Sequence, residues 1–365
     1  MTGKQCALSA MQLRKTGRIP KWIGVPRHPE FLRRLTGIDP YDSTRTATIR
    51  AIEALELDVS DYYESMQPSL LAGPETRCVE NETLSAFYSV GIGGADGGSV
   101  WKDHSRRFED VEDVLNYDVA QHPLNRTVEQ FESQLSQSLA RVKVHRRALG
   151  DRAWVPDPVD WYNTVFMWGV TTFGWHAFLT AAGLEPERYA RLLSLFVGIT
   201  LRYFTAASRL KGIMLAQSHD DLCASRGPVF SPAWYRQYVF PQYPRVLAPI
   251  KAKGAKVIYR GDGNISAIVA DLAAAGFDGF FVRSESDLGE IAARYGQSRI
   301  ILGNISTKVV TFGGKTEIEA EVKRCVRQAG HCPGYFLHIS GELPFNVPTD
   351  NLFYLFEALK QYSRR

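Results

Sequence analysis

Short apolar runs alternate with longer amphipathic segments through the C-terminal half of the chain. The runs are rich in Ile, Val, Leu and aromatic residues and are too short for helices. They cover 210–217, 255–260, 278–283, 299–304 and 334–340. Continuous apolar runs of this length are typical of parallel strands buried on both faces. We therefore expect each run to form a buried parallel strand.

Helical patterns separate these runs. They cover 231–254, 264–276, 286–296, 316–330 and 348–365. Ser231 followed by Pro232 is typical of an N-cap and a first helical residue, and the prolines between 241 and 249 must bend or divide that helix. Asn264 is placed to cap the helix that follows it. Strands and helices that alternate with short connections indicate right-handed βαβ units.

Two architectures fit this alternation, a doubly wound sheet and a closed barrel. A doubly wound nucleotide-binding domain would open with a Gly-rich phosphate loop, and the chain has no GxGxxG or GxxxxGK[ST] in that context. We therefore predict an α/β fold of the (β/α)8 TIM barrel type. Residues 1–365 would form one domain, with residues 1–45 as an irregular N-terminal extension that packs on the barrel.

The N-terminal half is less regular. Residues 45–58 predict a helix followed by a strand, and the Gly-rich segment 90–105 predicts a long loop or a hairpin. Aromatic residues recur near seven-residue spacing in the middle of the chain, at Trp154, Trp161, Phe166, Trp168, Phe173 and Trp175. This spacing favours a core or interface stripe, and an apolar substrate wall is the alternative.

Composition and charge narrow the class of protein. Hydrophobic residues make up 45% and charged residues 22%, without an apolar run long enough to span a bilayer, so we expect a soluble protein that does not bind membranes. The 43 basic and 39 acidic residues are interspersed, which gives no case for a nucleic-acid partner. Five scattered cysteines without a CxxC pair, and no secretory signal, predict a cytoplasmic protein with free thiols.

The active site of such a barrel forms at the carboxyl ends of its strands, so the polar residues just beyond each apolar run are the candidates. His219, Asp220 and Asp221 follow the first run, and we expect two of these three to enter the cleft. The later strand ends supply Arg260, Asp262, Arg283, Glu285, Asn304, His338, Glu342 and Asn346. This set suits either a metal bound by oxygen and nitrogen ligands, or an acid–base pocket in which Arg neutralises an anionic substrate.

Three stretches carry a resemblance to a known family. They are HDDLCASRGPVFSPAWYRQYVFPQYPRVLAPIKAKGAKVIYRGDGNI, GFDGFFVRSESDLGEIAARYGQSRIILGNIS and GYFLHISGELPFNVPTDNLFYLFEAL. Together they resemble the uroporphyrinogen decarboxylase superfamily from His219 to the C-terminus. The resemblance implies a (β/α)8 barrel with a deep cleft at the carboxyl ends of the strands. It leaves the reaction open, because the superfamily contains cofactor-free decarboxylases and methyltransferases that use a corrinoid, often with zinc.

The chain departs from both patterns of that superfamily. The resemblance to the decarboxylases implies an Arg-rich loop near the N-terminus, but the segment RIPKWIGVPRHPEF does not contain such a loop. It also implies a His late in the chain, where this chain has Ser340. The thiol-type methyltransferases have a pattern like HxCG where this chain has Arg260 to Gly263, and a late Cys where it has Gly341. A sulfur-rich zinc site is therefore not carried over, although Asp262, Glu285 and Glu342 are candidate ligands for a metal.

Two functional hypotheses follow, with a third from another class. The first is a methyltransferase that demethylates a small O- or N-methyl compound onto a corrinoid carried by a partner protein, with or without zinc. His219, Asp220, Asp262 and Glu342 would be its catalytic residues, and Arg260, Arg283, Asn304, His338 and Asn346 would bind the substrate. The alternative is a decarboxylase or lyase without any cofactor. The third is a non-catalytic barrel that binds a small acid or a tetrapyrrole. A homodimer is also expected.

Overall fold

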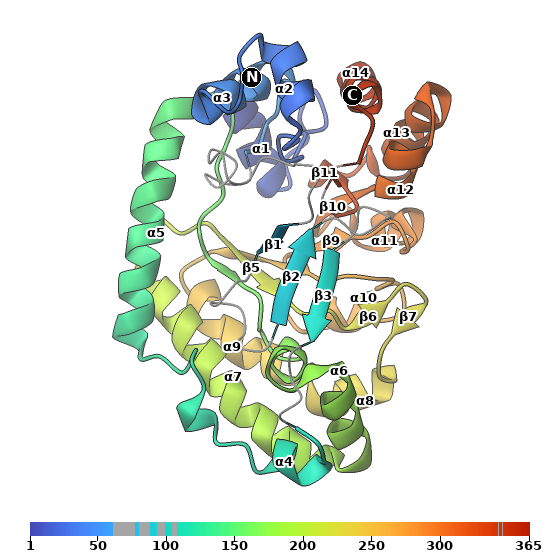
Figure 1. Ribbon diagram of the computed structural model, residues 1–365. Helices are drawn as coiled ribbons and strands as arrows, with labels where there is room; N and C mark the ends of the chain where they lie inside the picture. The colour runs from blue at the N-terminus through green and yellow to red at the C-terminus, as the bar shows by residue number, and fades with distance from the viewer. Residues whose placement is uncertain (61–76, 80–87, 93–98, 104–107, 342, 345) are drawn as a thin grey trace.

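The computed structural model describes residues 1–60, 77–79, 88–92, 99–103, 108–341, 343–344 and 346–365 (Figure 1). Its principal sheet has six parallel strands in the order β11-β10-β9-β8-β5-β4. These strands are β4 (Asp160–Trp161), β5 (Leu215–His219), β8 (Lys256–Arg260), β9 (Gly279–Val282), β10 (Ile300–Ile305) and β11 (Tyr335–Ile339). The five buried parallel strands that the apolar runs predict are confirmed as β5, β8, β9, β10 and β11.

Two further segments close this sheet into a barrel. Lys21 pairs in parallel with Leu337 of β11, and Val59 pairs in parallel with Trp154, which precedes β4 on the same extended stretch of chain. The Val59 N–H donates to the carbonyl oxygen of Lys21 at 3.2 Å, which joins the two segments. Six strands and two bridging segments make eight, so the predicted (β/α)8 barrel is confirmed. Residues 1–45, predicted as an extension, also supply the first of the eight.

The inside of the barrel is filled by one apolar layer. Five of the six strands, both bridging segments and Trp154 contribute to this buried cluster, which contains Trp22, Val59, Trp154, Leu215, Ile258, Phe281, Ile300, Leu302 and Phe336. Ala7, Ala10 and Met11 of α1 (Gly3–Met11) belong to the same cluster, so the N-terminal helix closes the amino end of the barrel. A ligand site inside the barrel can therefore open only at the carboxyl ends of the strands.

Helices surround the barrel (Figure 1). In the first half of the chain they are α2 (Pro29–Thr36), α3 (Thr44–Ala54), α4 (Val111–Leu115), the 3-10 helix Val119–Gln121, α5 (Val128–Leu149), α6 (Met167–Leu184) and α7 (Pro186–Arg209). In the second half they are α8 (Pro232–Tyr238), α9 (Gln242–Lys251), α10 (Val269–Ala274), α11 (Leu288–Tyr295), α12 (Thr307–Phe312), α13 (Lys315–Ala329) and α14 (Thr349–Tyr362).

The start and the division of the first predicted helix are confirmed. The Ser231 hydroxyl accepts a hydrogen bond from the Trp234 N–H, as an N-cap does, and the pattern 231–254 is split into α8 and α9 around Pro241. The cap predicted at Asn264 is wrong, because α10 begins only at Val269. Asn264 instead accepts the Ser266 N–H at 3.0 Å, and this bond shapes the turn before the helix.

Smaller strands lie outside the barrel. The hairpin predicted in 90–105 is confirmed in part: β2 (Tyr88–Ile92) and β3 (Ser99–Asp103) pair antiparallel, and β1 (Arg77–Val79) pairs with β2. β6 (Cys223–Ala224) and β7 (Gly227–Pro228) form a second short ribbon after β5. Most of the aromatic stripe is buried, with Trp168 stacked on Phe196 at 5.1 Å, which confirms the core interpretation.

One helix in the described part of the chain, α7, has the length and composition to cross a membrane. More than half of its most apolar window is buried in the structure, and it packs between α5 and α9 against the barrel. Burial of this kind is typical of a core helix in a globular domain.

Candidate functional site

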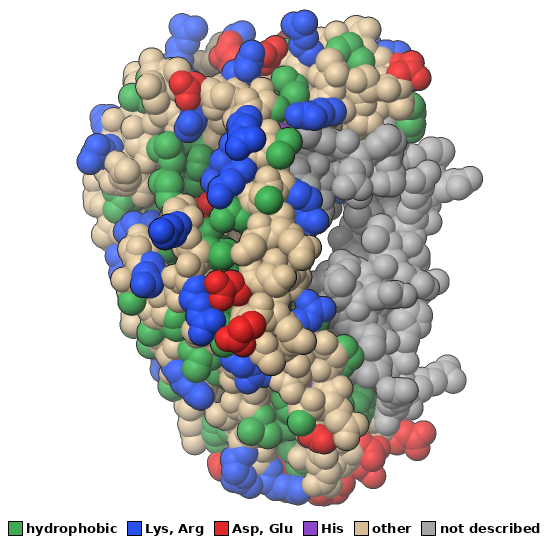
Figure 2. All heavy atoms as spheres, turned by 90° about the vertical axis from the view of Figure 1, so that its left-hand side faces the viewer, with side chains coloured by type: hydrophobic (Ala, Val, Ile, Leu, Met, Phe, Trp, Pro, Cys, Tyr) green, Lys and Arg blue, Asp and Glu red, His purple; other side chains and the backbone are tan. Residues whose placement is uncertain are grey.

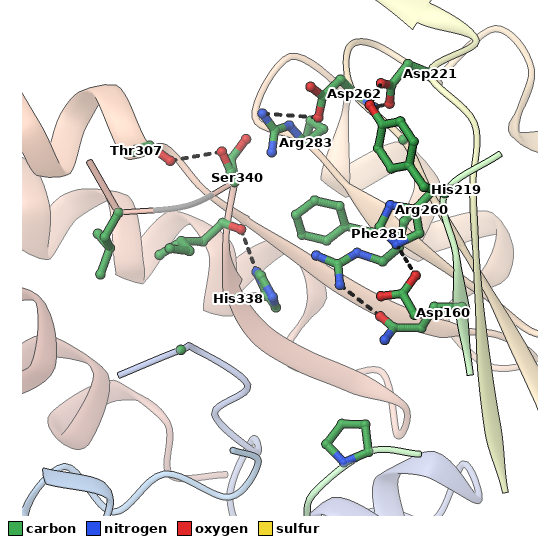
Figure 3. Close-up of a pocket in the computed structure, with 18 of the residues that line it drawn as sticks. Asp160, His219, Asp221, Arg260, Asp262, Phe281, Arg283, Thr307, His338 and Ser340 are labelled. Atoms are coloured by element: carbon green, nitrogen blue, oxygen red, sulfur yellow. Dashed lines mark hydrogen bonds and ion pairs between the residues drawn. The ribbon is translucent and has the colours of Figure 1, made fainter. Parts of the chain in front are cut away.

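A cavity of about 1200 Å³ opens at the carboxyl ends of the strands (Figure 3). Its walls come from β4, β5, β8, β9 and β11, from the loops that follow them, and from α5 and α12. The location is the one expected from the barrel, because the α1 end is closed.

Residues at the carboxyl ends of β4, β5, β8, β9 and β11 line this cavity, many of them at a spacing of two. The cavity is lined by Gln217, His219 and Asp221, by Arg260 and Asp262, by Phe281 and Arg283, by His338 and Ser340, and by Asp160 and Tyr162. Successive strand residues point to opposite faces, so a step of two keeps side chains on one face. The expectation that two of His219, Asp220 and Asp221 enter the cleft therefore has a geometric explanation: His219 and Asp221 enter, and Asp220 does not.

Two arginines and a phenylalanine form the cationic part of the cavity. The guanidinium carbon of Arg260 lies 5.2 Å from the ring centre of Phe281, and that of Arg283 lies 5.7 Å from the same ring. The Arg260 Nη1 donates to the side-chain oxygen of Gln217 at 2.9 Å, a partner without charge. In Figure 3 the Arg260 and Arg283 side chains lie on either side of the Phe281 ring. Their charge is thus placed where an anionic substrate group could bind.

A histidine–carboxylate pair lies beside them. The His219 Nε2 is 2.7 Å from the Asp160 Oδ1 (Figure 3). Although burial raises the pKa of Asp160, the charges of His219 and Arg260 outweigh it, so the pKa of this carboxyl is lowered. Asp160 is therefore ionised near neutral pH and lies within ion-pair distance of His219.

A second acidic group lies at the rim. Asp221 accepts the Asp262 N–H at 2.8 Å and the Tyr162 hydroxyl at 3.3 Å. Burial raises the pKa of Asp221, and the carboxylate of Asp262 raises it further. The Asp262 Oδ1 is also 3.3 Å from the Arg283 Nη2. Asp262 thus contacts a cation, whereas the raised pKa of Asp221 favours the neutral form of that carboxyl.

His338 of β11 and Ser340, which follows this strand, also line the cavity. Burial lowers the pKa of His338 to about 3, and the charges of Arg260 and Arg283 lower it as well. The imidazole is therefore neutral, and its Nδ1 contacts the carbonyl oxygen of Ile339. The Ser340 hydroxyl accepts the Ser284 N–H at 2.7 Å. His338 thus presents an uncharged ring beside the arginines.

Asp220 lies on the other face of β5 and does not line the cavity. Its carboxylate is fully buried and accepts the backbone N–H groups of Val165 and Met167 and the Tyr243 hydroxyl. These bonds tie the end of β5 to the loop before α6. The geometry therefore favours a structural role over the catalytic role predicted for Asp220.

The remaining predicted residues are scattered. Asn304 is fully buried outside the cavity, and its amide donates to the carbonyl oxygens of Arg283 and Ser286. Glu285 is exposed at the rim. Asn346 does not line the cavity, and Glu342 lies outside the described residues.

Of the three predicted metal ligands, the structure describes Asp262 and Glu285, and Glu342 lies outside the described residues. No group of three His, Cys, Asp or Glu that could hold a metal ion occurs in the part of the chain that the structure describes. Asp262, a predicted metal ligand, contacts the guanidinium of Arg283. Because this guanidinium is positively charged, it disfavours the binding of a metal cation at Asp262. Four cysteines, Cys6, Cys223, Cys325 and Cys332, are free and buried away from the cavity.

Several cavity residues escaped the sequence-based prediction. Asp160, Tyr162, Gln217 and Phe281 line the cavity with the predicted set. The signal for Gln217 and Phe281 was the step of two back from His219 and Arg283. Asp160 and Tyr162 had no comparable signal, because β4 is two residues long and follows Pro156 and Pro158.

Comparisons with known proteins place the chain in a family. Residues 161–362, more than half of the chain, match the family model described as uroporphyrinogen decarboxylase (URO-D). The chain belongs to the uroporphyrinogen decarboxylase family. The matched region contains every strand of the principal sheet from the end of β4 onward, and with it all the cavity residues of β5, β8, β9 and β11.

Curated relatives in this family match over a similar region. The uroporphyrinogen decarboxylase of Geobacter sulfurreducens is 26% identical over 182 residues, which are 49% of this chain and 51% of that protein. That of Carboxydothermus hydrogenoformans is 28% identical over 178 residues, 49% of each protein. The chain therefore spans about half the length of the curated relatives it matches.

A solved structure extends the fold likeness to the whole chain. The methyltransferase from Methanosarcina mazei aligns over 99% of both chains with a TM-score of 0.65 and 16% sequence identity. At this identity the likeness concerns the fold, which agrees with the closed barrel described above.

Proposed function

We propose that this protein is an enzyme that binds a small carboxylate-bearing substrate through Arg260 and Arg283 and removes a carboxyl group as CO₂. The observation that supports the proposal is the pair of guanidinium groups beside Phe281 in a cavity of about 1200 Å³. Arg260 is held by a neutral amide, so its charge is available to an anion. The decarboxylase names of the curated relatives point in the same direction.

Different cavity residues would bind the substrate, transfer the proton and stabilise charge during the reaction. Arg260 and Arg283 would hold a carboxylate that does not react, while the reacting carboxylate faces the uncharged rings of Phe281 and His338. A protonated His219, paired with Asp160, would first give its proton to the ring carbon that bears the reacting carboxylate. Asp262 would stabilise the positive charge that this proton brings to the substrate. The bond between that carbon and the carboxylate then breaks, CO₂ leaves, and the electron pair of the bond neutralises the charge on the substrate.

The test measures CO₂ release from a panel of aromatic and pyrrole carboxylic acids, with uroporphyrinogen included. We expect turnover with at least one member, and a 10- to 100-fold loss of kcat/KM in Arg260→Gln, about the value of one charge-assisted hydrogen bond. Arg294→Gln is a matched control, because Arg294 pairs with Glu290 on the surface of α11. A wild-type protein that releases no CO₂ from any acid in the panel would refute the proposal.

The second candidate is the demethylation of a small O- or N-methyl compound, with the methyl group passed to a corrinoid carried by a separate protein. It is supported by Ser340 and Gly341, which depart from the decarboxylase and thiol-type patterns, and by the full-length fold likeness to a solved methyltransferase. The corrinoid would supply the methyl acceptor. This chain would bind an anionic group of the methyl donor through Arg260 and Arg283, and His219 would protonate the leaving oxygen or nitrogen.

A corrinoid assay separates the two candidates. The protein is incubated with a reduced corrinoid protein and a panel of methoxy and methylamino acids, and cobalt methylation is followed by its absorption change. Cobalt methylation that needs Arg260, without CO₂ release, would support the second candidate. Absence of methylation with every donor would remove it.

A further inference from the structure

Ser60 lines the cavity but belongs to none of the groups described above. It ends the bridging segment that contains Val59, and its N–H donates to the carbonyl oxygen of Trp154 at 2.8 Å. Its hydroxyl oxygen lies 3.0 Å from the Nε2 of His145, which is buried on α5. A serine fixed at a strand end by a buried histidine is well placed to meet a ligand at the mouth.

The tautomer of His145 decides what the Ser60 hydroxyl can do. Burial lowers the pKa of His145 to about 4, and the charge of Arg45 lowers it further, so the ring is neutral. Its Nδ1 is buried and has no hydrogen-bond partner among the described residues. A buried N–H without an acceptor is rarer than a buried acceptor without a donor. The ring proton is therefore assigned to Nε2, which donates to the Ser60 oxygen.

This assignment leaves the hydroxyl hydrogen of Ser60 unused. Within the described residues, the contact with His145 is the hydrogen bond of that hydroxyl, and there Ser60 is the acceptor. The hydrogen is then free to point into the cavity that Ser60 lines.

Ser60 and the arginines lie on opposite sides of the mouth. In ring order, the segment at Val59 is the second of the eight strands, and β8 and β9 are the fifth and sixth. In a closed barrel of eight strands, the second and the sixth face each other. A ligand whose carboxylate is bound by Arg283 can therefore reach Ser60 across the mouth.

We propose that Ser60 donates a hydrogen bond to a second oxygen of the substrate, on the side of the mouth opposite Arg260 and Arg283. This inference rests on the carboxylate site of the proposed function. It defines the substrate class more narrowly: an acid that also carries a carbonyl or ether oxygen, at a distance that spans the mouth. His145 is the positioning residue, because its Nε2–H directs the Ser60 hydrogen away from α5.

Calorimetry with two series of probes tests the inference. One series is the monomethyl esters of linear α,ω-dicarboxylic acids of graded length, and the other is simple alkanoates of the same lengths. We expect the wild-type protein to prefer the ester at one length by about 2- to 10-fold, the value of one neutral hydrogen bond. Ser60→Ala should abolish this preference and leave the affinity for the alkanoate unchanged.

Control variants keep the outcomes distinct. Ser60→Thr keeps the hydroxyl and should restore the preference, whereas Ser138→Ala, which removes another cavity-lining hydroxyl on α5, should not change it. An unchanged preference in Ser60→Ala would overturn the inference but not the carboxylate site. Equal affinity of Arg260→Gln and the wild-type protein for the alkanoates would overturn the carboxylate site. A wild-type protein that binds neither series would overturn both.

Discussion

Replacing Asp220 by Ala separates a structural role from a catalytic one. The carboxylate accepts the Val165 N–H at 2.9 Å, the Met167 N–H at 2.7 Å and the Tyr243 hydroxyl at 2.7 Å, and it is fully buried. Asp220→Ala leaves these three donors without an acceptor in a site that water does not reach. Each such donor costs about 1–3 kcal/mol, so we expect the free energy of unfolding to fall by about 3–9 kcal/mol.

The assay is urea unfolding followed by tryptophan fluorescence. A loss of this size is a large part of the roughly 5–15 kcal/mol that stabilises a typical domain, so the midpoint should fall strongly. Asp220→Asn keeps one acceptor oxygen and should lose about half as much. Asp262→Ala is the matched control, because that carboxylate is 64% exposed and its pair with Arg283 contributes about 1 kcal/mol or less. An Asp220→Ala protein that unfolds like the wild type but is inactive would refute the structural role.

The same carboxyl predicts a pH dependence. Burial raises the pKa of Asp220 from 3.8 to about 7, although its hydrogen bonds oppose this. Because the folded pKa lies above the unfolded one, the stabilisation is present below pH 3.8 and is lost as the pH rises through 7. At 1.36 kcal/mol per pKa unit, the wild-type protein should lose up to about 4 kcal/mol relative to Asp220→Asn over this range. Parallel pH profiles of the two proteins would contradict the assignment.

Three further variants test other contacts. Gly341→Ala should weaken carboxylate binding about tenfold in calorimetry, because its Cβ would lie 2.6 Å from the Arg283 Nη1. His122→Gln should flatten the pH dependence of stability between pH 6.5 and 4: burial lowers the pKa of His122 to about 4, so the wild type loses about 2 kcal/mol by pH 5. Asn304→Ala should lower the free energy of unfolding by about 2–4 kcal/mol in urea, since its amide bonds two buried carbonyls.

The strands were predictable because each is a continuous apolar run between polar residues. It was harder to predict which alternate side chains of each strand point into the cavity. His219 and Asp221 enter the cavity and Asp220 does not, and only the pairing of β5 with β4 and β8 fixes which alternate residues face inward. A one-residue shift of register would have exchanged them. Sequence therefore located the strand end but not which of its carboxylates reaches the ligand.

The first half of the barrel was less predictable for a different reason. The segments at Lys21 and Val59 enter the ring through single bridges, and β4 is two residues long, so none of them produces a long apolar run. Their identity as strands depends on neighbours that are far away in sequence. Asp160 and Ser60, which lie at the ends of two of these strands, were missed for that reason.

One departure from the pattern that the resemblance implies has a physical explanation. The resemblance to the thiol-type methyltransferases implies a Cys where this chain has Gly341. A Cβ at position 341 would lie 2.6 Å from the Arg283 guanidinium, and the backbone φ of +115° is itself unfavourable for a side chain. A cysteine there and the observed position of Arg283 therefore exclude each other. The glycine thus leaves room for the Arg283 guanidinium at this edge of the cavity.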